Sequence, residues 1–162
     1  MSLFVLRMKY SREILYFWAK VKSETGIESN FADAWGFGDN PELMDELLSY
    51  ILIGKKRSST SLLKESELQG HPLDKVGDYN IILNGKEEPV AVIKTVSVRR
   101  VKYRDVNAEH AYWEGEGDRT LETYFLEHDK YYQRVGEKLG FEFDKEMLVD
   151  LVRFELVYPL NR

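Results

Sequence analysis

Apolar residues recur every three to four positions in two stretches of the N-terminal third, which predicts two amphipathic helices. The first helix spans residues 11–25, with Ser11 as its N-cap and Gly26 as its end. The second begins at Asn40-Pro41, a capping residue followed by proline at the first helical position, and its apolar stripe ends at Gly54. Local capping chemistry therefore predicts both ends of each helix.

The middle of the chain and its C-terminal end show strand patterns instead. Residues 79–83 and 89–103 are rich in β-branched and aromatic residues, and Asn84-Gly85 between them is a strong hairpin signal. Residues 147–157 form a long apolar run with few helix or strand breakers, which predicts a closing strand. These segments indicate a β-rich centre.

Between the hairpin and the closing strand the helical pattern returns. A short helix is expected over residues 108–113, with Asp105 or Asn107 as its cap. A longer one is expected to run to Leu139 behind a capping Asp118. Helices and strands in this order, without a repeat or a linker, predict a single α+β domain.

Two polar segments far apart in the sequence combine residue types that chemistry uses. GKKRSST, residues 54–60, places three cations beside three hydroxyls, and residues 108–122 interleave carboxylates with aromatics and glycines. A hydroxyl near a lysine, facing a carboxylate across a cleft, is the arrangement that proton transfer on a small polar substrate requires. The alternative is structural, because cations at a helix C-terminus also complement the helix dipole.

Composition narrows the class of protein. The 162 residues are 43% apolar and 13% aromatic, which is enough for one packed domain, and the net charge of −5 argues against a general polyanion binder. The chain has no cysteine, which excludes disulfides and cysteine-ligated zinc and fits a reducing compartment. With no apolar stretch long enough to span a membrane and no signal peptide, a soluble cytoplasmic protein is expected.

Several stretches match a known family in sequence and in order: AWGFGD at residues 34–39, the helix at 41–54, GKKRSSTSL, PLDKVGDY, PVAVIKTVSV, EGEGDRTLE and FELV. The chain resembles the ASCH domain family, a branch of the PUA-like superfamily. The resemblance implies an α+β, PUA-like fold with a small β-barrel of five to six strands flanked by helices. It divides the chain into an N-terminal helical extension, residues 1–29, and an ASCH domain, residues 30–162. It also implies a cleft between barrel and helices that binds RNA or a modified nucleoside.

In part the chain resembles small amidohydrolases that remove acyl groups from N4-acylcytidines. These enzymes use a lysine and a threonine spaced as Gly-x-Lys-x-x-Thr, with a glutamate downstream. The resemblance implies Lys56 as base, Ser59 as nucleophile and Glu114 as the assisting carboxylate. Serine in place of threonine keeps the hydroxyl but loses the methyl group that restricts χ1. Thr60 is the alternative nucleophile if the loop is shifted by one residue.

The cleft is expected to bind its ligand through aromatic, cationic and polar side chains, namely Trp35, Phe37, Arg57, Thr60, Tyr112, Asp118 and Arg119. Aromatic rings there would stack on a base, although such rings also serve as lids of the core. No cofactor and no metal are expected. His110 and Glu114 have a spacing that can ligate a metal on one helical face, and the alternative is a hydrogen-bonded histidine.

These expectations leave three functions open: an amidohydrolase acting on an N4-acylcytidine-like substrate, a non-catalytic RNA-binding module, and a ribonuclease. They also make a geometric prediction. If the site is real, the Lys56 ammonium lies within one water-bridged contact of the Glu114 carboxylate. The hydroxyl of Ser59 or Thr60 should open to the same cavity, which Trp35 or Phe37 partly walls.

Overall fold

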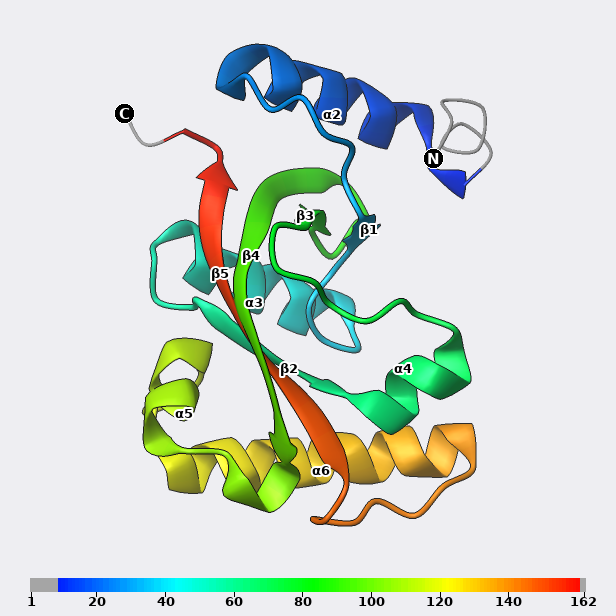
Figure 1. Cartoon of the computed structure of the whole chain (residues 1–162), viewed down its shortest axis with the longest axis vertical. Coiled ribbons are helices and arrows are strands. Elements are labelled where there is room, and N and C mark those ends of the chain that lie inside the picture. Colours follow the sequence, from blue (N-terminus) through cyan, green and yellow to red (C-terminus); the bar gives the residue numbers. More distant parts are fainter. Residues whose placement is uncertain (1–8, 161–162) are drawn as a thin grey trace. The chain divides into compact units, whose positions relative to one another are not determined.

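The computed structural model describes residues 9–160, and within them five strands hydrogen-bond into one sheet in the order β1-β3-β4-β5-β2 (Figure 1). The chain divides into two compact units. Among the described residues, unit 1 comprises 9–54, 77–94 and 155–160, and unit 2 comprises 55–76 and 95–154. Strands β4 (Pro89–Lys102) and β5 (Leu148–Tyr158) each pass from one unit into the other.

Unit 1 contains the first two predicted helices. Helix α2 (Arg12–Thr25) begins after Ser11, whose side chain accepts from the Ile14 amide, and it ends at Gly26. Helix α3 (Pro41–Leu52) begins after Asn40 in the same way. Both caps are those that the sequence predicts.

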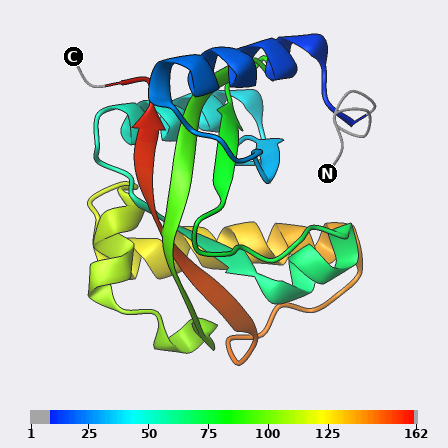
Figure 2. The same cartoon turned by 45° about the horizontal axis from the view of Figure 1, so that its top comes forward.

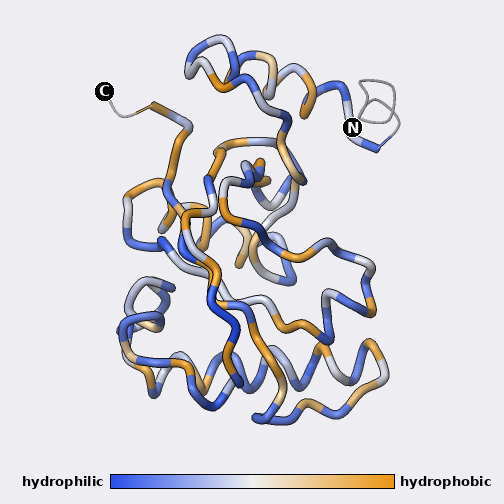
Figure 3. The backbone as a smooth tube through the Cα atoms, in the orientation of Figure 1, coloured by the Kyte–Doolittle hydropathy of each residue, from blue (hydrophilic) through white to orange (hydrophobic). Residues whose placement is uncertain are grey.

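Strands β1 (Asp33–Trp35) and β3 (Tyr79–Leu83) complete unit 1 with the first part of β4. β1 runs parallel to β3, and β3 pairs antiparallel with β4 across the predicted hairpin. The inner face of α2 packs on these strands, where Trp18 and Val21 meet Ile81 and Val92. In Figure 3 the hydrophobic positions recur along α2 among hydrophilic ones, as an amphipathic helix requires.

Unit 2 is built around strand β2 (Ser58–Leu62), which pairs antiparallel with β5. A short helix α4 (Leu63–Gln69) follows it, and a single 3₁₀ turn (Tyr103–Asp105) follows β4. Helices α5 (Ala108–Glu114) and α6 (Leu121–Leu139) complete the unit, and Figure 2 shows α6 as the long yellow-to-orange helix. Within residues 9–160, no helix has both the length and the apolar content that crossing a bilayer requires.

The core of unit 2 is aromatic. Tyr103 is fully buried and makes edge contacts with the rings of Tyr132 and Phe143, and its hydroxyl donates to Asp129 at 2.7 Å. Leu62 of β2 and other apolar side chains of β5, α5 and α6 join the same cluster. This core fixes the positions of α5 and α6 relative to β2, and those three elements carry the site described below.

Two local predictions need correction. Helix α6 begins after Thr120, whose hydroxyl oxygen accepts from the Thr123 amide, and not after Asp118. Asp118 instead accepts from the Thr120 amide and hydroxyl at 3.0 and 2.7 Å, so it supports the capping residue from outside the helix. The second correction is β2, because the sequence pattern of residues 58–62 did not predict a strand.

Candidate functional site

Six polar side chains of unit 2 converge beside β2: Lys56, Thr60, His110, Glu114, Tyr124 and His128. Lys56 precedes β2 and Thr60 lies in it, while the other four project from α5 and α6. Lys56 and Glu114 are buried, with 1% and 3% of their surface exposed. Lysine and glutamate are rarely buried unless they are paired, so this buried pair marks the centre of the site.

The ammonium of Lys56 is enclosed by oxygen acceptors. It donates to Glu114 Oε2 at 3.1 Å, to the Ser58 carbonyl at 2.9 Å and to the Glu114 carbonyl at 3.3 Å. Burial by itself raises the pKa of the Glu114 carboxyl, but the Lys56 charge and the His110 hydrogen bond outweigh it and hold that pKa well below its usual range. Glu114 is therefore a carboxylate at neutral pH.

The hydroxyl of Thr60 lies at the centre of three polar contacts. Its Oγ1 is 2.6 Å from Glu114 Oε1, 2.6 Å from the Tyr124 hydroxyl and 2.9 Å from His110 Nε2. A hydroxyl has one proton to donate and two lone pairs to accept with, and an ionised carboxylate only accepts. The arrangement that satisfies all the groups has Thr60 donating to Glu114 while Tyr124 and the His110 Nε2–H donate to Thr60.

His128 contacts the same network from α6. Its ring stacks on Tyr124 with centroids 3.8 Å apart, and Nδ1–H donates to the Tyr124 carbonyl at 2.9 Å. Burial lowers the pKa of His128, against the opposing charge of Glu114. The neutral ring then presents the lone pair of Nε2 to Glu114 Oε2, 3.8 Å away.

Helix α5 is positioned for this site by its two ends. At the start, the Asn107 side chain accepts from the His110 amide, and the i,i+4 spacing puts His110 and Glu114 on one face. At the end, Gly115 adopts a left-handed conformation with φ of 76°. A Cβ at Gly115 would lie 2.5 Å from the Lys55 carbonyl oxygen, so only glycine allows α5 to approach the segment that carries Lys56.

Replacing Gly115 by alanine is therefore expected to destabilise unit 2 by about 1–3 kcal/mol, because the new methyl group must displace backbone and adopt a strained φ. The measurement is the free energy of unfolding in urea. Gly70→Ala is the matched control, since Gly70 also ends a helix with positive φ but a Cβ added there would meet no atom within 4 Å. An equal loss in both variants would contradict a role for the close approach to Lys55.

The predicted meeting of Lys56 and Glu114 is confirmed, since their 3.1 Å contact is direct. Of the two candidate hydroxyls, Thr60 is the one that meets Glu114. Ser59 precedes Thr60 in β2, and because successive side chains of a strand point to opposite faces, its hydroxyl points away from Glu114. Thr60, the alternative that the sequence left open, is therefore the candidate nucleophile.

The remaining predicted residues of unit 2 surround the end of α5. Arg119 lies over the Tyr112 ring at 3.6 Å and donates to the carbonyls of Tyr112 and Lys55 at 2.9 and 3.2 Å. The Arg57 amide donates to the Trp113 carbonyl at 2.7 Å. Arg57 and Arg119 thus attach α5 to the segment before β2, and Tyr112 keeps 47% of its surface exposed.

Two predicted aromatics belong to unit 1. The rings of Trp35 and Phe37 make an edge contact with centroids 4.5 Å apart, and Trp35 Nε1 donates to Asn80 at 3.1 Å. Phe37 is buried in the core of that unit. Their role in ligand binding stays a prediction.

Sequence reasoning missed Tyr124 and His128 as members of the site. The helical pattern predicts Tyr124 on the inward face of its helix, which is correct, but an apolar stripe does not reveal that the hydroxyl has a buried partner. His128 follows Tyr124 by one helical turn, so the i,i+4 pair of a tyrosine and a histidine on a buried face was the available signal.

The dense basic run at the end of β4 has acidic partners. Arg100 donates to the buried Asp150 carboxylate at 2.9 and 3.1 Å, and Lys102 donates to Glu146 at 2.9 Å. Arg104 also pairs with Glu146. The end of β4 and the 3₁₀ turn after it therefore form an ion-pair network within unit 2.

The ASCH domain family model matches residues 33–158. The chain belongs to the ASCH domain family. It is similar to the crystal structure of an ASCH domain from Lactobacillus crispatus JV V101, with a TM-score of 0.83 and 26% identity over 94% of this chain and 98% of that one. It is also similar to protein EF3133 of Enterococcus faecalis V583, with a TM-score of 0.82 and 26% identity over 91% of each chain. None of the curated proteins compared with it matches.

Family membership confirms the predicted fold class. The domain is α+β and PUA-like, with five of the expected five to six strands among residues 9–160. The family match includes Lys56, Thr60, Glu114, Tyr124 and His128 within its bounds. The polar cluster is thus part of the ASCH domain of this chain.

Proposed function

We propose that this ASCH domain binds a nucleoside or a nucleotide of RNA at the Thr60–Glu114 cluster and hydrolyses an N4-acylcytidine-like amide. The observation that carries the proposal is the 2.6 Å contact between Thr60 Oγ1 and Glu114 Oε1. It pairs a hydroxyl nucleophile with an ionised acceptor, which is the minimal arrangement for nucleophilic catalysis. Thr60 as a residue is half-buried.

In the first half-reaction, Thr60 Oγ1 forms a bond to the acyl carbon of the substrate, and the hydroxyl proton passes to Glu114 Oε1. The tetrahedral intermediate then collapses, and its bond to the exocyclic nitrogen breaks. The nitrogen takes the proton back from Glu114 and leaves as the free amino group of cytidine. The product on the protein is an acyl ester of Thr60.

In the second half-reaction a water molecule attacks the ester carbon and gives one proton to Glu114. The bond to Thr60 Oγ1 breaks, and the proton returns from Glu114 to that oxygen. The carboxylic acid leaves, and the cluster regains its starting protonation state. Glu114 alternates between base and acid, as a single carboxylate serving both steps must.

The other residues of the cluster have supporting roles in this scheme. In this scheme Lys56 is the ion-pair partner that keeps the buried Glu114 ionised before the reaction, instead of the base that the resemblance implies. Tyr124 and His110 donate to Thr60 Oγ1, so they stabilise the negative charge that develops on the oxygen as its proton leaves.

Two alternative functions are distinguished by the experiment described below: a non-catalytic RNA-binding module and a ribonuclease. The arginine and aromatic side chains around α5, including exposed Tyr112, support contacts to a base or a phosphate. The buried ion pair of Lys56 and Glu114 is consistent with each of the three functions. The contact between Thr60 and Glu114 is what favours hydrolysis.

The test is incubation of the purified chain with N4-acetylcytidine, followed by chromatographic separation of cytidine. Release of cytidine is the expected result. RNA binding without turnover, weakening steeply as salt rises, supports the binding module. Shortened RNA fragments support the ribonuclease.

Replacing Tyr124 by phenylalanine is expected to lower kcat for acetylcytidine by about tenfold to a hundredfold with little change in KM. It removes one of the two donors to Thr60 Oγ1, the oxygen on which negative charge develops as its proton leaves. The ring that stacks on His128 is retained, so the fold should be preserved. Tyr131→Phe on the same helix is the matched control, and its kcat should stay within about twofold of the original. A change in KM alone would contradict the assigned role.

Two broader expectations also stay predictions. One is the boundary between an N-terminal extension, residues 1–29, and the ASCH domain, residues 30–162. The other is a cytoplasmic location, which the absence of cysteine supports without fixing it.

A further inference from the structure

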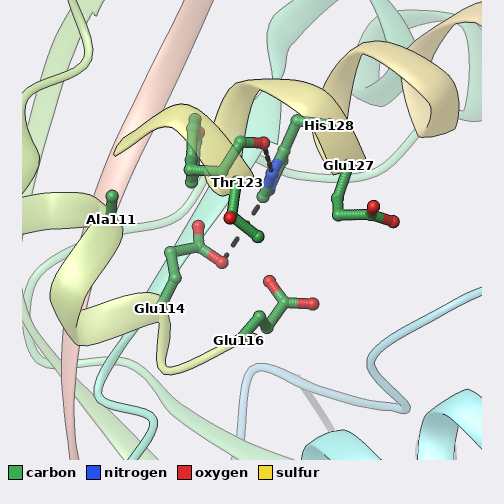
Figure 4. Close-up of a pocket in the computed structure, with 7 residues that line it drawn as sticks. Ala111, Glu114, Glu116, Thr123, Glu127 and His128 are labelled. Atoms are coloured by element: carbon green, nitrogen blue, oxygen red, sulfur yellow. Dashed lines mark hydrogen bonds and ion pairs between the residues drawn. The ribbon is translucent and has the colours of Figure 1, made fainter. Parts of the chain in front are cut away.

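A small cavity opens beside Glu114, and its lining is rich in residue types that ligate metals (Figure 4). Glu114, Glu116 and His128 each offer one ligand atom to it, and these three atoms lie within 4.8 Å of one another. The cavity has a volume of about 10 Å³, which is enough for one water-sized particle. In Figure 4 the two carboxylates and the imidazole turn toward a common centre.

The histidine provides a second observation, independent of the carboxylates. His128 Nδ1 donates to the Tyr124 carbonyl, and this orientation places Nε2 3.8 Å from Glu114 Oε2. A metal-ligating histidine typically donates its other ring N–H to a backbone carbonyl, which is the arrangement here.

The distances suit a small cation. Ligands held about 2.1 Å from a tetrahedral ion lie about 3.4 Å from each other. The pair Nε2 and Oε2, at 3.8 Å, is within a few tenths of an ångström of that separation. Glu116 lies between Gly115 and Gly117, both of which have positive φ, in the short segment that joins α5 to α6.

The neighbouring ammonium does not exclude a metal. Lys56 contacts Glu114 Oε2 at 3.1 Å, and a carboxylate oxygen has two lone pairs, so it can accept from lysine and ligate an ion. Two carboxylates outweigh the single lysine charge, so the lining remains net negative. Imidazole with carboxylates is a donor set that suits zinc and its first-row neighbours.

We propose that Glu114, Glu116 and His128 form a binding site for a first-row divalent cation such as Zn²⁺, adjacent to the Thr60 hydroxyl. This site differs from the sequence-based expectation, in which no metal was expected and the metal-ligand spacing was that of His110 and Glu114. His110 is instead occupied with Thr60 and Glu114 Oε1. The site shares Glu114 with the proposed hydrolysis and goes beyond it, because it adds a metal ligand that the hydrolytic scheme does not use.

The test is equilibrium dialysis of the full chain against ZnCl₂, with the bound metal counted by elemental analysis. Saturable binding of one ion per chain is expected. Glu116→Gln and His128→Asn should each weaken binding by about tenfold or more, since each removes one ligand. Glu116 is half-buried and outside any helix or strand, so its variant should fold even if the variant at His128 does not.

Glu127→Gln is the matched control, because Glu127 lines the same cavity but is not among the three converging ligands. His71→Gln controls for binding at an exposed histidine. Both should leave the affinity unchanged. The absence of saturable binding at millimolar Zn²⁺ would overturn the proposal, and so would binding that Glu116→Gln leaves intact. The dialysis measures metal binding without turnover, so its failure does not decide whether the chain hydrolyses acetylcytidine. A failure of the acetylcytidine assay, in turn, does not decide whether the chain binds Zn²⁺.

Discussion

Replacing Lys56 by methionine is expected to lower the free energy of unfolding by about 3–5 kcal/mol. Methionine fills a similar volume, so packing is largely retained. The Glu114 carboxylate, however, loses the ammonium 3.1 Å away and remains buried among groups that cannot solvate it as water does. Urea denaturation followed by circular dichroism measures the loss as a lower transition midpoint.

Lys55→Met is the matched control, since it makes the same chemical change one residue earlier at a half-buried position. It should alter the free energy by no more than about 1 kcal/mol. A double variant, Lys56→Met with Glu114→Leu, should recover part of the loss, because it removes the unpaired charge. If Lys55→Met and Lys56→Met have equal effects, the pair has no special role in stability.

Replacing Thr60 by valine is expected to reduce acetylcytidine hydrolysis by about 10³- to 10⁴-fold. Valine keeps the shape and the β-branch of threonine and loses only the hydroxyl that contacts Glu114, Tyr124 and His110. Thr60→Ser should retain most of the activity, within about tenfold, since it keeps the hydroxyl and loses only the restriction on χ1. Steady-state kinetics by chromatography provide the measurement.

Ser59→Ala supplies the matched control for the nucleophile. It removes a hydroxyl from the adjacent position of β2, on the opposite face of the strand, and should leave kcat within about twofold. Activity that survives Thr60→Val but not Ser59→Ala would reverse the assignment. RNA binding that Thr60→Val leaves unchanged, in a chain without turnover, would favour the binding module.

The order of helical and strand patterns along the chain was sufficient to predict an α+β domain and most of its helices and strands. Helix starts at Ser11, Asn40 and Asn107 follow from side chains that accept from amides within the first turn, which is a local interaction. The hairpin at Asn84-Gly85 is equally local. The sequence left Asp105 and Asn107 as alternative caps of α5, and for α6 it predicted Asp118 where Thr120 is the cap.

Strand β2 shows why part of the site was beyond sequence reasoning. Residues 58–62 are mostly small hydroxyl-bearing residues with no apolar alternation, and they become a strand through pairing with β5 far along the chain. That pairing places Thr60 opposite Leu151 and thereby decides which hydroxyl meets Glu114. A register shifted by one residue would have presented Ser59 instead.

By itself, the sequence of this protein determined the residue types of the site and the local geometry of its helices, because caps, turns and i,i+4 spacings act within a few residues. It also suggested that Lys56 and Glu114 belong together. Only the tertiary structure decided that Thr60 is their partner and that Tyr124 and His128 join them. The contacts of Glu114 with Lys56 and Thr60, and of Thr60 with Tyr124, join residues more than 50 positions apart, so they depend on β-sheet register and helix packing that no local pattern encodes.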